Sequence, residues 1–218
     1  MKKLAFLVSV LLFAACQPSQ EKKAIELVKS TLAKEHPTAV KSYKSAEITI
    51  DSAFLSFATD STLLAYTAQF HDVSARVAHI VKLRKVTQVN LNMFDPSTTG
   101  LGRSSYDEAL QKYEEQTSLI ALGEAVLDST FLNIKERYAA LPQDTYCGWL
   151  IHNKCSGIRL MGYSDYTFIA NDAMTHAFYY ETKDYNALCS LLESIISAES
   201  LSDWRTQQLA ASLMEPAD

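Results

Sequence analysis

The stretch LLAYTAQFHDVSARVAHIVKLRKVTQVNLNM, residues 63–93, contains neither glycine nor proline. Its apolar residues recur at steps of three and four, which is the spacing of a helix with one apolar face. They are Leu63, Tyr66, Phe70, Val73, Val77 and Ile80, continued by Leu83 and Val86 with a slip in phase. We expect one long helix here, ended by the Pro- and Gly-containing run 95–102.

A second helical pattern follows this break. It begins near Ser104 or Ser105, and only Gly123 lowers its helix propensity. Mostly apolar positions again step by four and three: Tyr106, Leu110, Tyr113, Thr117, Ile120, Glu124, Leu127, Phe131, Ile134 and Tyr138. Two long helices joined by a short turn pack antiparallel. The sequence therefore predicts a helical hairpin at about 61–140.

Shorter elements flank this hairpin. A helix starts near Ala24 and ends before Pro37, and a strand over 43–51 alternates apolar Ile48 and Ile50 with polar residues. Aromatic-rich runs predict antiparallel strands at 145–155, 164–170 and 175–181, covered by a helix at 185–197. The expected fold class is α+β, with one domain over 24–200 and a C-terminal helix with a frayed tail over 201–218.

The N-terminus has the pattern of an export signal. Lys2 and Lys3 precede an apolar run that stops at Cys16, and this run is shorter than the roughly 20 residues that span a bilayer. The small residues Ala14 and Ala15 before Cys16 resemble the signal of bacterial lipoproteins. The resemblance implies cleavage of residues 1–15, acylation of Cys16, and attachment to a membrane through this lipid. Residues 16–23 would form a polar tether.

A second resemblance lies in the C-terminal half. The block GWLIHNK at 148–154, followed by YTFI at 166–169 and an Asn-Asp turn, is similar to lipoproteins of the Bacteroidota. It implies location and fold rather than activity. In lipoproteins of that phylum an acidic run after the cysteine resembles a surface-export tag, and Gln17-Pro18-Ser19-Gln20-Glu21 lacks it. The resemblance therefore implies a protein on the outer membrane that faces the periplasm. In that phylum, Asp-Ser-small patterns resemble O-glycosylation acceptors, here at Ser52, Ser61 and Ser129.

Charge and cysteine content narrow the possible partners. The formal net charge is −5, and loss of residues 1–15 removes two lysines and makes it −7. This acidity argues against a nucleic-acid partner. Cys147 and Cys155 are too far apart on one strand to form a disulfide, so any bridge would use Cys189, and three thiols are the favoured state. No short cysteine pair suggests zinc, and we expect no metal or cofactor.

Two sets of residues are candidates for sites. Tyr146, Trp149, Tyr166 and Phe168 could line a ligand pocket, since the predicted sheet and helix resemble a cup of the cystatin or nuclear-transport-factor type. Glu124 falls where the second hairpin helix should face the first. His71 is its expected partner and Arg76 another, unless Glu124 lies at the edge of the hairpin.

The sequence contains no recognised catalytic motif. The first functional hypothesis is therefore a non-enzymatic, lipid-anchored envelope protein that binds another envelope component through its hairpin. The alternative is a small-ligand cup, and an enzyme ranks last. An exposed apolar surface on the hairpin would favour the first hypothesis, and a large apolar pocket beside the sheet would favour the second.

Overall fold

The computed structural model describes residues 19–93, 101–158 and 163–214. The chain divides into two compact units. The sheet unit comprises Met1–Thr59 and Pro142–Ala187, and the helical unit comprises Asp60–Leu141 and Leu188–Asp218. The predicted signal peptide, Cys16, most of the predicted turn at 95–102 and the predicted frayed tail lie outside the described residues.

The sheet unit contains one antiparallel sheet of four strands in the order β1-β2-β3-β4. The strands are β1 Lys44–Phe54, β2 Tyr146–Ser156, β3 Tyr163–Ala170 and β4 Ala177–Glu181. A row of paired residues crosses all four strands: Ile50, Ile151, Phe168 and Tyr179. The period-two alternation of each strand places this apolar row on one face.

Helix α2, Gln20–Glu35, covers that face. Its first turn is capped by Ser19, whose hydroxyl accepts a hydrogen bond from the Lys22 amide at 3.4 Å. Its buried residues Ala24, Leu27, Val28 and Leu32 belong to the same core as the strand residues. A short 3-10 helix, η1 Ala39–Ser42, follows Pro37 and leads into β1.

The structure adds detail to these expectations. Residues 24–200 divide between two compact units, and their grouping as one domain stays a prediction. Residues 20–23 are the first turn of α2 and not part of a tether. The helix that shares the core of the sheet is the N-terminal α2, because α5 joins the helical unit from Leu188 onward.

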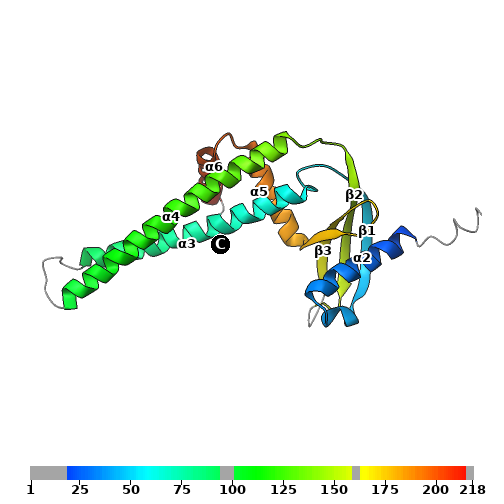
Figure 1. The fold of residues 1–218 in the computed structure, drawn as a ribbon, viewed down its shortest axis with the longest axis horizontal. Helices are drawn as coiled ribbons and strands as arrows, with labels where there is room; N and C mark the ends of the chain where they lie inside the picture. The colour runs from blue at the N-terminus through cyan, green and yellow to red at the C-terminus, as the bar shows by residue number, and fades with distance from the viewer. Residues whose placement is uncertain (1–18, 94–100, 159–162, 215–218) are drawn as a thin grey trace, which may run out of the picture. The chain divides into compact units, whose positions relative to one another are not determined.

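The helical unit confirms the predicted hairpin. Helices α3, Ser61–Met93, and α4, Leu101–Ala139, pack along each other (Figure 1). Phe70 and Val77 of α3, with Leu127 and Phe131 of α4, are buried in this unit. Helices α5, Thr182–Ser197, and α6, Leu201–Met214, complete the chain.

Side-chain contacts attach these C-terminal helices to the hairpin. The Trp204 ring of α6 meets the Phe70 ring of α3 edge-on, with ring centroids 4.9 Å apart. Lys135 of α4 donates hydrogen bonds to the carbonyls of Ile196 and Ala198, at 2.6 and 2.7 Å. These carbonyls lie at the end of α5, where helix carbonyls lack intrahelical partners.

The slip in phase on α3 has a structural consequence. Leu83 and Val86, which continue the apolar side with this slip, are 44% and 60% exposed. No described helix is long and apolar enough to span a membrane.

The cysteines follow the prediction for β2. This strand runs unbroken over Tyr146–Ser156, so Cys147 and Cys155 lie near its opposite ends. Neither they nor Cys189, which all lie in the described part of the chain, form a disulfide.

Candidate functional site

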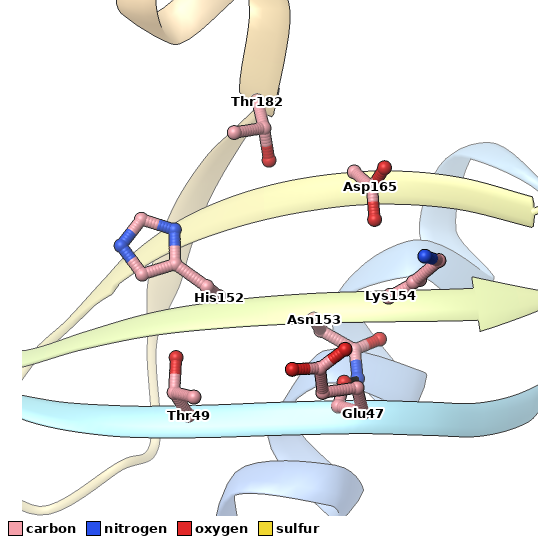
Figure 2. A pocket seen from close by; sticks show the side chains of 7 residues that line it. All are labelled: Glu47, Thr49, His152, Asn153, Lys154, Asp165 and Thr182. Carbon is pink, nitrogen blue, oxygen red and sulfur yellow. Dashed lines mark hydrogen bonds between the residues drawn. The ribbon is translucent and has the colours of Figure 1, made fainter.

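A pocket opens on the face of the sheet opposite α2 (Figure 2). It has a volume of about 290 Å³. Side chains from three neighbouring strands and from the start of α5 line it: Glu47, Thr49, His152, Asn153, Lys154, Asp165 and Thr182. Strand pairing explains this grouping, because Thr49 lies opposite His152, and Lys154 lies opposite both Glu47 and Asp165.

A short chain of hydrogen bonds runs beneath this pocket. His152 Nδ1 lies 3.0 Å from Thr167 Oγ1, and the same hydroxyl lies 3.1 Å from Thr182 Oγ1. Because Thr167 occupies Nδ1, His152 Nε2 is the ring nitrogen left for a ligand. His152 alternates with Ile151 along β2, so its side chain lies on the opposite face of the sheet.

The charges at the pocket are mixed. The Lys154 ammonium lies 5.5 Å from the centre of the Tyr163 ring, a cation–π contact at the edge of the site. Glu47 and Asp165 supply two carboxylates, on either side of Lys154 in the strand register. Such a site suits a small polar ligand better than an apolar one.

The groups needed for covalent catalysis are poorly placed. The Thr167 hydroxyl lies beside an imidazole, as a nucleophile would, but its residue is 0% exposed and a substrate cannot reach it. Burial, and then the nearby Asp165 carboxylate, raise the pKa of the Cys155 thiol to about 11, so it remains protonated near neutral pH.

Among the described residues, no group of three or more His, Cys, Asp or Glu side chains could hold a metal ion.

The four aromatic candidates separate into two sets. Tyr146 and Trp149 meet edge-on at 6.0 Å and both hold the turn after β3. The Tyr146 hydroxyl donates to Asp172 Oδ1 at 2.7 Å, and the Trp149 indole donates to the Asp172 carbonyl at 2.9 Å. Burial, and then the hydrogen bond to Asp172, raise the pKa of Tyr146 to about 12. This pair therefore fixes a turn.

Tyr166 and Phe168 are core residues. They are 4% and 0% exposed, and Phe168 stacks on Tyr179 at 5.2 Å. The face that Tyr166 and Phe168 share is covered by α2, whose apolar residues pack where we expected a ligand. The sequence could not distinguish a helix from a ligand as the occupant of this apolar face. Tyr166 also lines a second pocket of about 290 Å³, together with Glu35 and Tyr179.

The predicted pair between Glu124 and His71 is wrong. Glu124 forms an ion pair with Arg205 of α6. The His71 side chain is exposed and lies 3.5 Å from its neighbour Asp72. The prediction considered only the two hairpin helices, whereas α6 packs on them and brings the arginine to Glu124.

A second candidate site is a surface of α3. Lys82, Val86, Val89 and Met93 recur at steps of four, three and four, and so they share one side of the helix. Val86, Val89 and Met93 are 60%, 52% and 73% exposed. Lys85 is exposed beside them. We call these five residues the outer face of α3. Three large apolar side chains this exposed, on a single helix face, indicate a contact surface.

Neither the sheet pocket nor the outer face of α3 was among the predicted sites, although the sequence contains a signal for each. Alternation on β1 already placed Glu47 and Thr49 on the face opposite Ile48 and Ile50. The outer face of α3 could have been found from the slip in phase after Ile80, since a slipped apolar stripe cannot stay in the same seam.

The three candidate glycosylation sites are on the surface. Ser52 lies in β1, Ser61 opens α3 and Ser129 lies in α4, and each residue is exposed. Their modification stays a prediction.

Comparison with known proteins adds no relative. No family model, no curated protein and no solved structure matches the chain. The function must therefore be argued from the residues described above.

Proposed function

We propose that the protein is a lipid-anchored component of the cell envelope, held through Cys16, that binds another envelope component through its helical hairpin without catalysis. The single observation that carries the proposal is the set of exposed apolar side chains on the hairpin. They are Leu83, Val86, Val89 and Met93 on α3, with Leu119, Leu122 and Leu132 on α4. Exposed apolar groups on both helices of the hairpin support a binding role.

The N-terminal sequence supports the location. Lys2, Lys3, the apolar run and Ala14-Ala15-Cys16 have the order of a lipoprotein signal. Two acyl chains on one residue give the two membrane attachments that stable anchoring requires. The acidic run that resembles a surface-export tag in Bacteroidota lipoproteins does not follow Cys16. We therefore propose that the protein lies on the periplasmic side of the outer membrane.

Site-specific photo-crosslinking in living cells tests the binding role. A photoreactive amino acid at Val86, an exposed position on α3, should give covalent adducts with an envelope component. The same amino acid at Gln111, an exposed position on α4, is the matched control and should give few. Equal labelling at both positions, or none at either, would contradict a binding role for the hairpin.

A small polar ligand at the sheet pocket is the second candidate function. It is favoured by His152, which lines the same pocket as the Glu47 and Asp165 carboxylates and whose Nδ1 is already held by Thr167. The volume of about 290 Å³ is at the lower end for ligand pockets, which are typically about 300–1,000 Å³. A library of small polar compounds that raises Tm in the native chain but not in a His152→Ala variant would support this alternative.

A further inference from the structure

The hairpin has a division of charge that the proposed function does not use. Helix α3 contains four Lys or Arg and one Asp or Glu, whereas α4 contains four Lys or Arg and seven Asp or Glu. From Val73 to Met93 the sequence has no acidic residue at all. The acidic α4 and the basic α3 therefore present opposite charges to the surroundings.

The basic groups on the outer face of α3 are available for a partner. Lys82 and Lys85 are exposed, and neither makes an ion pair in the described part of the chain. Lys82 shares its side of the helix with Val86, Val89 and Met93. A helix face that combines lysines with exposed apolar side chains, on an element too polar to span a bilayer, has the composition of an interfacial helix.

We infer that the outer face of α3 docks on an anionic phospholipid surface. This inference rests on the proposed function, since it names the envelope component that the hairpin binds. The lysines would contact lipid phosphates while Val86, Val89 and Met93 enter the boundary between headgroups and acyl chains. The acidic α4 would be repelled by the same surface, so charge selects which side of the hairpin faces the lipid.

A second copy of the chain fits this face less well. A symmetric contact between two outer faces would bring the same uncompensated lysines together. A contact between the basic α3 of one copy and the acidic α4 of another is heterologous. It leaves α4 of the first copy and α3 of the second unoccupied, so that further copies can add. A lipid surface covers the face without either difficulty.

Vesicle co-sedimentation tests the inference without the lipid anchor. The probe is a chain of residues 17–218, which retains every described helix and strand and lacks both Cys16 and the apolar leader. It should bind vesicles of phosphatidylethanolamine with phosphatidylglycerol, and it should bind vesicles of phosphatidylcholine alone weakly. Binding should decrease with added salt, because the Debye length falls from about 10 Å at 0.1 M to about 3 Å at 1 M.

Variants identify the face. Each lysine near an anionic surface strengthens binding about fivefold, so Lys82→Gln with Lys85→Gln should weaken it about 25-fold. Val86→Ser with Val89→Ser should weaken it about tenfold through lost apolar contact. The matched control is Lys29→Gln with Lys41→Gln, which removes the same charge from two other exposed positions and should leave binding unchanged. Circular dichroism melts of every variant establish that the chain remains folded.

The possible results separate this inference from the proposed function. If the control pair weakens vesicle binding as much as the Lys82 and Lys85 pair does, net charge alone determines binding, and the inference is overturned. Absence of vesicle binding would also overturn it, and the proposed function would stand if crosslinking at Val86 captured a protein. If the chain does not bind vesicles but self-associates, and this self-association depends on Val86 and Val89, the inference is overturned and the outer face of α3 binds a second copy of the chain.

Discussion

A single glycine sets how closely the two hairpin helices approach. A Cβ built on Gly123 of α4 would clash with Val77 Cγ2 on α3. Val77 is β-branched and has little rotamer freedom in a helix, so it cannot turn away. We therefore expect Gly123→Ala to destabilise the protein by about 1–3 kcal/mol through overpacking, although alanine favours the helix by about 1 kcal/mol over glycine. Chemical denaturation measures the change.

A compensating variant provides the control for this prediction. Val77→Ala removes the methyl groups that an added Cβ would meet. The double variant Gly123→Ala with Val77→Ala should therefore be more stable than the sum of the two single changes predicts. Strict additivity would show that the helices do not meet at this point.

Asp60 predicts a dependence of stability on pH. Its carboxylate caps α3 by accepting the Leu63 amide hydrogen bond at 2.9 Å, and Arg137 of α4 donates to its two oxygens at 2.6 and 3.3 Å. Burial alone would raise the pKa of Asp60, but the hydrogen bonds from Arg137 and the Leu63 amide outweigh it and lower the pKa. The stabilisation is present above the unfolded pKa, about 3.9, and is lost as the pH falls through the folded pKa.

Asp60→Asn tests this dependence while keeping a residue that can cap the helix. At neutral pH we expect the variant to have a Tm lower by about 2–6 °C. The difference in Tm between the native chain and the variant should shrink as the pH falls below about 4, because protonated Asp60 no longer attracts Arg137. A difference that stays constant between pH 7 and pH 2 would contradict the assigned ion pair.

At the scale of elements, the seam of the hairpin should dominate the stability of the helical unit. Phe131 is 4% exposed, and the Lys135 ammonium lies 6.0 Å from the centre of its ring. Truncating a buried phenylalanine costs about 3–5 kcal/mol, so Phe131→Ala should lower Tm strongly. Gln111→Asn, at an exposed position of the same helix, should change the stability by less than about 0.5 kcal/mol. Equal effects of both changes would mean that the two helices do not pack on each other.

The elements also show how far the sequence could predict this structure. The α+β class, both hairpin helices and the four strands follow from apolar periodicity, because burial of one face requires that period. The partners of each face do not follow from it. The apolar Phe168 indicated that its face of the sheet is covered, but not that α2 covers it. The charged Glu124 indicated that it needs a partner of opposite charge, but not that Arg205 of α6 is this partner. Such pairings depend on contacts distant in the sequence, which a local pattern does not specify.

On the scale of the whole molecule, the hairpin is an insertion within the sheet unit. Strands β1 and β2 are neighbours in the sheet, yet α3 and α4 separate them in the sequence. The Leu55 amide donates to the Thr145 carbonyl at 2.7 Å and the Asp144 amide donates to the Leu55 carbonyl at 3.3 Å, which extends the pairing of the two strands to the base of the insertion. Because the two ends of the insertion are held together by strand pairing, the insertion can carry a binding surface without interrupting the sheet.

The proposed lipid at Cys16 and the proposed outer face of α3 would give the molecule two membrane contacts with different chemistry. The acyl chains bind through apolar burial, and Lys82 and Lys85 bind through charge, so only the second contact weakens as salt screens it.

The native chain should therefore incorporate radiolabelled palmitate and remain in the membrane fraction at high salt. A chain exported behind an ordinary cleavable signal, with Cys16→Ser, should incorporate no label and should leave the membrane fraction when salt is raised. Adding Lys82→Gln and Lys85→Gln to that chain should release it at low salt as well. Equal palmitate labelling of the Cys16→Ser chain would show that Cys16 is not the attachment site.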